Sequence, residues 1–89
     1  MINNENWPKR GTQVIAQKAA NDLLLFNMED GNYYSLNEIG SRIWELCDGS
    51  HSVSQVVAAL AGEYDASNQI LEKDVLELLE DFRRGKLIA

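Results

Sequence analysis

A single cysteine and a single histidine lie close together in this sequence and could form a nucleophilic site. Cys47 and His51 are four residues apart, a spacing that brings two side chains onto one face of a continuous helix. A thiol beside an imidazole can act as an activated nucleophile. The Asp48-Gly49 pair between them is typical of a helix end, so we expect no shared face. We interpret Cys47 as a reduced core thiol and His51 as a loop residue, and we predict that the protein is not an enzyme.

The sequence lacks the residue patterns that usually bind metals and cofactors. A zinc site uses several cysteines and histidines at short spacings, and a calcium loop uses alternating aspartates with a glycine. Neither pattern occurs in the sequence. Phosphate-binding loops need clustered glycines, whereas glycines 31, 40, 49, 62 and 85 stand singly. We therefore expect no catalytic residue, no bound metal and no cofactor, and a function based on binding.

The length and net charge of the chain restrict the kinds of molecule that we expect it to bind. A chain of 89 residues can sustain one small hydrophobic core. Fourteen acidic residues against eight basic residues give a net charge of −6, which opposes binding to nucleic-acid phosphates. No apolar run approaches the roughly 20 residues that cross a bilayer, and the polar start is unlike a signal peptide. We expect a cytoplasmic protein with no nucleic-acid and no membrane partner.

The first part of the chain predicts a small sheet. Residues 1–11 should form a polar arm in which Trp7 is anchored, and residues 12–89 should form the single peptide-binding domain. Strands are expected over residues 12–18, 23–28 and 32–36. The middle strand is apolar at consecutive positions, so both of its faces should be covered. Asp30-Gly31 should close a tight hairpin before the third strand.

Three helices are expected after the sheet. Asn37 should cap the first helix, and Ser52 should cap the second in a capping box with Gln55. The third should end at Arg84, just before Gly85. The predicted core faces consist of Ile39, Ile43, Leu46 and Cys47, then Val53, Val57, Leu60, Ala61 and Tyr64, then Leu71, Val75, Leu78, Leu79 and Phe82. The elements predict an α+β fold that is winged helix-turn-helix-like, with an N-terminal three-stranded antiparallel sheet followed by three helices.

An unprotected strand edge is the strongest functional signal in the sequence. The outer strands of a three-stranded meander have unpaired backbone groups, and residues 32–36 carry no charge or proline that would discourage further pairing. On the third helix, Leu76 lies outside the core stripe and gives one flank an apolar ledge edged by charge. We predict that an extended peptide adds to the strand and lies against this helix. The predicted peptide-binding residues are Asn32, Tyr33, Tyr34, Ser35, Leu36, Glu72, Val75, Leu76, Leu79 and Arg83.

The alternative function is that of a winged-helix DNA-binding transcription regulator. This interpretation rests on shape, because such proteins place a basic recognition helix in the major groove. The charged residues of the third helix are mostly acidic: Glu72, Asp74, Glu77, Glu80 and Asp81 against Lys73, Arg83 and Arg84. The second helix has no basic residue. Charge therefore favours the peptide-binding hypothesis.

The segment YYSLNEIGSRIWELCDGSHSVSQVVAAL, residues 33–60, resembles the PqqD-like family. The shared pattern is a Leu-Asn pair before the first helix, an Ile-Trp pair within it and an Asp-Gly pair before the second. In this chain the pairs are Leu36-Asn37, Ile43-Trp44 and Asp48-Gly49. Asp74-Val75 and residues 85–88 extend the match, which spans roughly residues 12–88. We assign these matched positions to the fold, as helix caps, packing residues and a turn.

The resemblance implies a non-catalytic function. Members of this family are recognition elements for ribosomally made, post-translationally modified peptides. They bind the leader of a precursor peptide antiparallel to the third strand, in the cleft against the third helix, and present it to modifying enzymes. The implied partners are a precursor leader peptide and a separate processing enzyme. That enzyme could be a radical-SAM enzyme of pyrroloquinoline quinone synthesis, or a leader peptidase with a cyclase in lasso-peptide synthesis. The short, discrete chain favours the lasso-type pathway.

Overall fold

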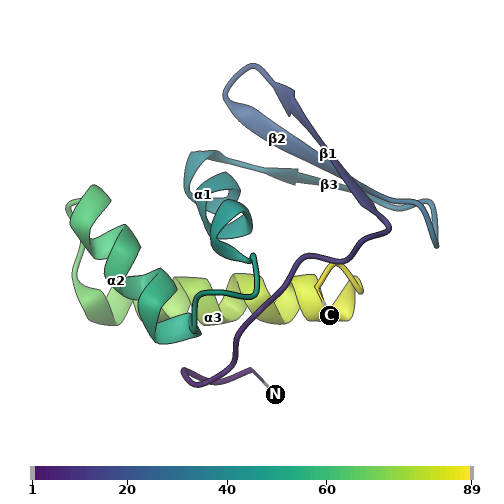
Figure 1. Cartoon of the computed structure of the whole chain (residues 1–89). Helices are drawn as coiled ribbons and strands as arrows, with labels where there is room; N and C mark the ends of the chain where they lie inside the picture. Colours follow the sequence, from purple (N-terminus) through teal and green to yellow (C-terminus); the bar gives the residue numbers. More distant parts are fainter. Residues whose placement is uncertain (1, 89) are drawn as a thin grey trace.

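The first half of the chain forms an antiparallel meander of three strands (Figure 1). The structure is a computed structural model that describes residues 2–88. The strands are β1 (Val14–Ala19), β2 (Asp22–Asn27) and β3 (Tyr33–Leu36), in the order β1-β2-β3. Gly31 has a φ of 74° in the hairpin between β2 and β3, a conformation that glycine adopts without steric cost. The predicted meander and its Asp30-Gly31 turn are confirmed.

Only one face of the sheet is covered by the helices (Figure 1). Side chains alternate between the faces along each strand, so Leu25 and Asn27 of β2 point inward and are fully buried. Leu24, on the outer face, is 39% exposed. The prediction that both faces of the middle strand are covered is therefore wrong. Ile15, Phe26 and Tyr33 are paired across the three strands on this outer face and form an apolar row there.

Three helices follow the sheet, and the first two begin at the caps that the sequence predicts. They are α1 (Glu38–Leu46), α2 (Val53–Glu63) and α3 (Asn68–Arg84). The Asn37 side chain accepts a hydrogen bond from the Gly40 N–H at 2.9 Å. Ser52 and Gln55 form a reciprocal capping box at the start of α2, and Ser67 caps α3. Each cap provides a partner for backbone N–H groups that a helix leaves unpaired at its first turn.

The core lies between the inner face of the sheet and the helices. Helix α1 lies between the sheet and α3, and α2 packs along α3 (Figure 1). Trp44 of α1 meets Phe82 of α3 edge to face, with ring centroids 5.4 Å apart, an arrangement that aromatic pairs prefer. The predicted core residue Ile39 is 37% exposed, because its side of α1 turns toward an open cleft described below.

The N-terminal segment lies across the helices and binds their ends. The carbonyl oxygens of Asn6 and Asn4 accept hydrogen bonds from the N–H groups of Val53 and Ser54, at 2.9 and 3.2 Å. These two N–H groups belong to the first turn of α2, where no partner exists within the helix. Trp7, predicted to be anchored, is 55% exposed; its neighbour Pro8 is the buried residue of the arm.

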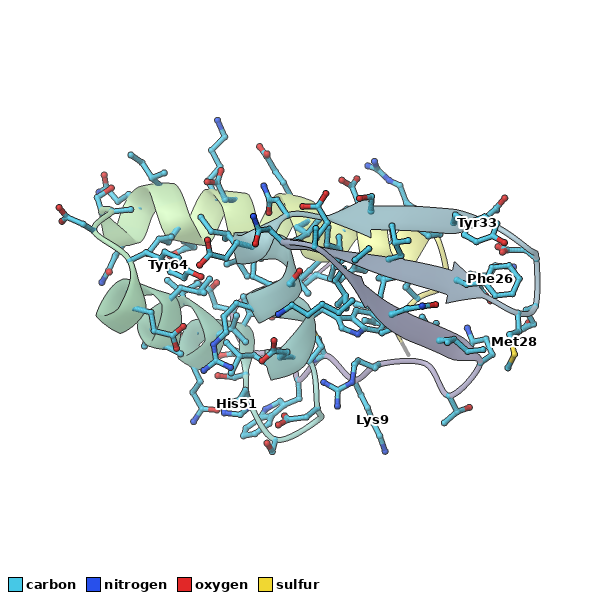
Figure 2. The ribbon with its side chains drawn as sticks, turned by 90° about the horizontal axis from the view of Figure 1, so that it is seen from above. Lys9, Phe26, Met28, Tyr33, His51 and Tyr64 are labelled. Carbon is cyan, nitrogen blue, oxygen red and sulfur yellow. The ribbon has the colours of Figure 1, made fainter. Side chains whose placement is uncertain are left out.

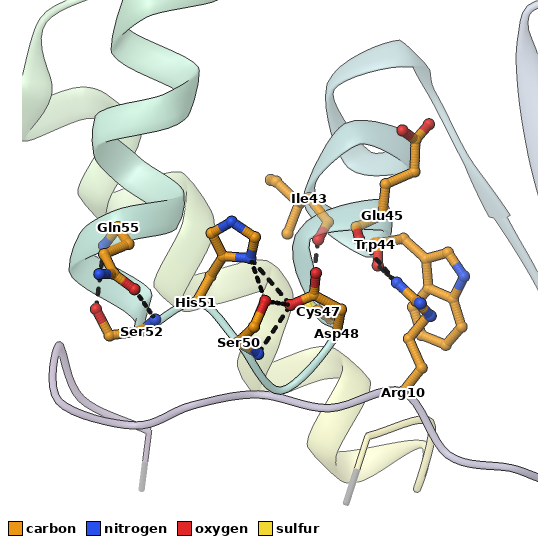
Figure 3. A network of polar contacts seen from close by, with 10 residues as sticks. All are labelled: Arg10, Ile43, Trp44, Glu45, Cys47, Asp48, Ser50, His51, Ser52 and Gln55. Carbon is orange, nitrogen blue, oxygen red and sulfur yellow. Dashed lines mark hydrogen bonds and ion pairs between the residues drawn. The ribbon is translucent and has the colours of Figure 1, made fainter.

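Arg10 and the C-terminal tail make further contacts beside the N-terminal segment. The Arg10 guanidinium donates hydrogen bonds to the carbonyl oxygens of Trp44 and Glu45 at the end of α1 (Figure 3), where a cation is favourable. Arg10 also forms a β-bridge with Ile88, and Leu87 is fully buried. Of the predicted arm and tail, positions 1 and 89 lie outside the described residues. Within residues 2–88, no helix combines the length and apolar character needed to span a membrane.

Candidate functional site

Strand β3 has one edge that no other strand of the described chain pairs with. It forms a ladder with β2 alone, whereas the two isolated bridges of residues 2–88 join Lys9 to Asp48 and Arg10 to Ile88. The N-terminal arm and the tail therefore pair with segments other than β3. An unpaired edge is a template for a further strand.

The register of the sheet identifies which backbone groups face the open edge. The N–H of Asn27 donates to the carbonyl of Asn32, directly opposite, at 3.0 Å. Hydrogen-bonded and non-hydrogen-bonded pairs alternate along an antiparallel ladder. Tyr34 and Leu36 therefore bond to β2, and the N–H and C=O groups of Tyr33 and Ser35 point outward. An incoming strand would find four backbone groups there, two donors and two acceptors.

A cleft of about 390 Å³ lies beside this edge, between β3, the start of α1 and α3. Seen from above, β3 is the strand nearest α3 (Figure 2). The residues that line the cleft are Ser35, Leu36, Asn37, Ile39, Gly40, Ile43, Asp74, Glu77, Leu78 and Asp81. The apolar side chains come from all three elements, and the carboxylates come from α3 alone. The volume is at the lower end of the range of ligand pockets, which suits a few side chains of an extended chain.

The two tyrosines of β3 point to opposite faces, as alternation predicts. Tyr33 is 75% exposed on the outer face, with its ring 4.8 Å from that of Phe26 (Figure 2). Tyr34 packs inward against the core and covers Gly85 at the end of α3. Of the other predicted β3 residues, Ser35 and Leu36 line the cleft, and Asn32 precedes the strand and bonds to Asn27.

The structure divides the predicted residues of α3 between the core and the flank that faces away from the cleft. Val75 and Leu79 are fully buried. The Glu72 carboxylate accepts a hydrogen bond from the Asn4 side chain, so its flank of the helix meets the N-terminal arm. Leu76 is half-buried on that same flank, and Arg83 forms an ion pair with Glu80. None of these five α3 residues lines the cleft. Contact between them and a peptide stays a prediction.

Sequence analysis missed the residues that form the α3 wall of the cleft. Successive residues of a helix turn by about 100°, so Asp74, Glu77 and Asp81 form one flank, opposite to that of Leu76. Leu78 lies between this acidic flank and the buried stripe and is half-buried. The recurrence of acidic residues at positions 74, 77 and 81 was the available signal, but it is equally typical of a solvated face.

The loop between α1 and α2 holds Cys47 and His51 in separate environments (Figure 3). Cys47 is fully buried, and its Sγ donates to the Ile43 carbonyl at 3.2 Å. Burial raises the pKa of this thiol to about 12, far above the range in which a thiolate nucleophile forms at neutral pH. His51 Nδ1 lies 2.9 Å from Asp48 Oδ1. The predicted core thiol is confirmed.

Asp48 organises this loop by accepting hydrogen bonds. Its Oδ1 accepts from the Ser50 hydroxyl at 2.7 Å and from the Ser50 N–H at 2.9 Å. These bonds from Ser50, with a further contribution from His51, lower the pKa of Asp48 because they stabilise the ionised carboxylate. Among residues 2–88, no group of three or more His, Cys, Asp or Glu side chains is placed to hold a metal ion.

Comparison with known proteins identifies the family. Residues 22–88 match the model of the family described as Coenzyme PQQ synthesis protein D (PqqD), which covers the chain from the start of β2 to the tail. The chain belongs to the PqqD family. The matched region contains β3, the cleft and α3, so the open edge belongs to the PqqD part of the chain.

Curated relatives of this PqqD-family chain are named for binding PqqA. A PqqA binding protein of Methylococcus capsulatus is 49% identical over 45 residues, which cover 51% of this chain and 46% of the relative. A PqqA binding protein of Rhodopseudomonas palustris is 38% identical over 45 residues, covering 51% of this chain and 44% of the relative. The match therefore spans less than half the length of these relatives.

Solved structures share the fold of this PqqD-family chain. One, described as TbiB1 in complex with the TbiA(beta) leader peptide, has a TM-score of 0.82 and 25% identity, covering 90% of this chain and 93% of that one. A second, described as lasso peptide synthetase B1 complexed with the leader peptide, has a TM-score of 0.83 and 18% identity, with coverages of 94% and 99%. The predicted α+β fold, with its three-stranded antiparallel sheet and three helices, is confirmed.

Proposed function

We propose that this protein is a non-catalytic binding protein that captures the leader of a precursor peptide. The leader adds antiparallel to β3 and places its side chains in the cleft between β3 and α3. The observation that carries this proposal is the open edge of β3, where the backbone groups of Tyr33 and Ser35 face outward beside that cleft. β-Strand addition uses such main-chain groups for affinity and neighbouring pockets for specificity.

The comparisons support the same function. The relatives are named PqqA binding proteins, and the structure with 25% identity is described as a complex with a leader peptide. Both comparisons concern proteins of the same family or fold. Because function depends on the site rather than on the fold, the open edge of β3 is the main support for the proposal. Together they favour a peptide ligand for the β3 edge.

A captured leader requires a second protein that acts on the precursor. We propose that this chain presents the leader to a separate processing enzyme. In pyrroloquinoline quinone synthesis that enzyme would be a radical-SAM enzyme, and in lasso-peptide synthesis it would be a leader peptidase acting with a cyclase. Of these two pathways, we propose the lasso type. Purification of the protein with each candidate enzyme and leader would distinguish these partners.

DNA binding is disfavoured by the charges on α3. A recognition helix contacts phosphates and base edges with basic residues. The cleft flank of α3 carries Asp74, Glu77 and Asp81, and its two C-terminal arginines form ion pairs with Glu80 and Asp81. We expect no shift of duplex DNA in a gel at physiological salt.

Titration with the leader portion of a candidate precursor peptide tests the function. We expect a Kd below about 100 μM, which corresponds to a binding free energy more favourable than about −5.5 kcal/mol. Amide hydrogen exchange locates the contact. The N–H groups of Tyr33 and Ser35 should exchange rapidly in the free protein and become protected on binding, because the leader backbone then accepts from them.

The neighbouring amides provide the internal control. Tyr34 and Leu36 bond to β2 with or without a peptide, so their exchange should change little. Absence of both heat and protection at a leader concentration of about 100 μM, well above a micromolar Kd, counts against the function. Binding that protects other amides and leaves Tyr33 and Ser35 unchanged would place the peptide elsewhere on the molecule.

A further inference from the structure

The cleft beside β3 has an apolar floor and an acidic wall. Its floor includes Leu36, Ile39 and Leu78, from three different elements. Its α3 wall presents the carboxylates of Asp74, Glu77 and Asp81, all on exposed positions. Of the described residues, no lysine or arginine lines the cleft. The residues contributed by β3 and the start of α1 are uncharged, so the negative charge is confined to one wall.

Two of these carboxylates are not engaged by the cations of the described chain. Asp81 lies 3.6 Å from Arg84 in an exposed ion pair. Within residues 2–88, no ion pair involves Asp74 or Glu77. The remaining arginines of the helical layer, Arg42 and Arg83, are paired with glutamates outside the cleft. Asp74 and Glu77 are therefore available to a cation that enters from outside.

We propose that the peptide bound at β3 is basic on the side that faces α3, with a lysine or arginine side chain seated in this cleft. This inference rests on the proposed peptide-binding function and specifies its ligand. A long basic side chain fits both surfaces at once, because its aliphatic stem covers apolar groups while its charged end stays near the solvated rim. The stem lies over Leu36, Ile39 and Leu78, and the cationic group reaches Asp74 and Glu77.

The geometry of strand addition supports this placement. Side chains of an added strand alternate between the two faces of the sheet. Those on the inner face point toward the helices, where the cleft lies, and those on the outer face lie beside Tyr33. The basic residues should therefore occur at alternate positions of the bound segment. Charge complementarity of this kind raises specificity and association rate more than it raises affinity.

Selection from a display library of random peptides tests the ligand class even when the natural leader is unidentified. We expect the enriched peptides to carry lysine or arginine at alternate positions. Replacing those residues by glutamine should weaken binding several-fold. Raising NaCl from about 50 to about 500 mM should weaken binding about three- to tenfold, because exposed charges are screened within a few ångströms at high salt.

A matched pair of charge-neutralising variants locates the effect on the protein. The double variant Asp74→Asn/Glu77→Gln should weaken binding of an enriched peptide about two- to twentyfold, as expected for two exposed ion pairs. The control Glu5→Gln/Asp65→Asn removes the same charge from exposed positions outside the cleft and should change binding less than about twofold, the size of a weak surface effect.

The outcomes separate this inference from the proposed function. Enrichment of neutral or acidic peptides, or equal effects of the two double variants, overturns the basic-ligand inference and leaves peptide binding intact. A library that yields no enriched peptide overturns both. Circular dichroism of all variants confirms that each remains folded, which is expected because the four substituted side chains are exposed.

Discussion

At the residue scale, the glycine at the end of α3 is explained by a contact with strand β3 rather than by the helix end itself. The left-handed residue that follows the helix is Lys86, with a φ of 58°, although glycine is usual there. The Lys86 and Leu87 N–H groups bond back to the carbonyls of Arg83 and Phe82. Gly85, the predicted stop, has an ordinary φ of −80°. A Cβ at Gly85 would lie 2.6 Å from the Tyr34 hydroxyl oxygen, so its lack of a side chain makes room for β3.

Two substitutions at adjacent positions should therefore have opposite effects on stability. Gly85→Ala should lower the free energy of unfolding by about 1–3 kcal/mol, because the new methyl group overlaps Tyr34. Lys86→Gly should raise it by about 0.5–1 kcal/mol, because glycine adopts a positive φ without strain. Urea denaturation measures both changes.

A control separates the steric cause from a loss of local backbone preference. Gly85→Ala should cost less in a Tyr34→Phe background, since the closest atom is then absent. An equal cost in both backgrounds would show that the contact with Tyr34 is not the cause. A neutral or destabilising Lys86→Gly would mean that the lysine stem contributes packing that offsets its backbone strain.

At the element scale, the two flanks of α3 have different roles. One flank carries Glu72 and Glu80, which bond to Asn4 and to the Ile2 N–H of the N-terminal arm. The other carries Asp74, Glu77 and Asp81 and forms a wall of the cleft. Each flank has one half-buried leucine, Leu76 or Leu78. The helix thus holds the arm on one side and faces the open strand edge on the other.

A matched pair of leucine substitutions should distinguish these roles. Leu78→Asp should weaken leader binding about tenfold or more, because it removes an apolar contact worth about 1.5–3 kcal/mol from the cleft. The sequence-based site predicts that Leu76→Asp also weakens leader binding, whereas the contact of this flank of α3 with the arm predicts a change within about twofold once the protein is folded. Calorimetric titration measures binding, and melting temperature reports any loss of folding.

The opposite result would favour the flank of α3 that the sequence predicts to contact the peptide. If Leu76→Asp abolishes binding while Leu78→Asp does not, the peptide contacts the flank containing Glu72, Leu76 and Arg83. Similar losses of melting temperature in both variants are compatible with either result, since both leucines are half-buried. The comparison of affinities, measured below the lower melting temperature, decides between the two walls.

At the scale of the whole molecule, the N-terminal arm bridges the end of α1 and the start of α2. Backbone hydrogen bonds from the arm reach the loop after α1 and the first turn of α2, and Arg10 binds the end of α1. The arm and the tail meet where Gly11 N–H donates to the Leu87 carbonyl at 2.7 Å. All of these contacts involve segments other than β3, which leaves the proposed binding edge open.

Deletion of residues 2–7 should lower stability and leave the binding edge intact. The N–H groups of Val53 and Ser54 lose their acceptors, and each hydrogen bond contributes about 0.5–1.5 kcal/mol. We expect a loss of about 1–2 kcal/mol in urea denaturation, because water can replace part of these bonds. Leader affinity of the folded protein should stay within about twofold, because the cleft lies on the opposite flank of α3.

Trp7→Ala is the control for this deletion. It removes a large but exposed side chain and keeps every arm carbonyl, so stability should change by no more than about 0.5 kcal/mol. A loss as large as that of the deletion would assign the stabilisation to the Trp7 side chain. A deletion that weakens leader binding strongly would mean that the arm contributes to the site.

Features that depend on near neighbours could be predicted from the sequence. The caps at Asn37 and Ser52 and the turn at Gly31 involve residues only a few positions apart, so local chemistry determines them. Alternation likewise placed Tyr33 and Tyr34 on opposite faces, because the period of a strand is fixed by its backbone. The order and composition of the elements predicted the α+β fold, its three-stranded meander and the open edge of the third strand.

Tertiary structure decided how these elements face one another. The sequence of α3 defines a buried stripe and two flanks, but which flank meets β3 depends on the rotation of the helix about its axis. That rotation is set by packing between residues far apart, such as Trp44 on Phe82. The same long-range packing turns Ile39 into the cleft and leaves the outer face of β2 uncovered. Helical periodicity determined which α3 residues share a face, and only the assembled core could place Asp74, Glu77 and Leu78 along the cleft beside β3.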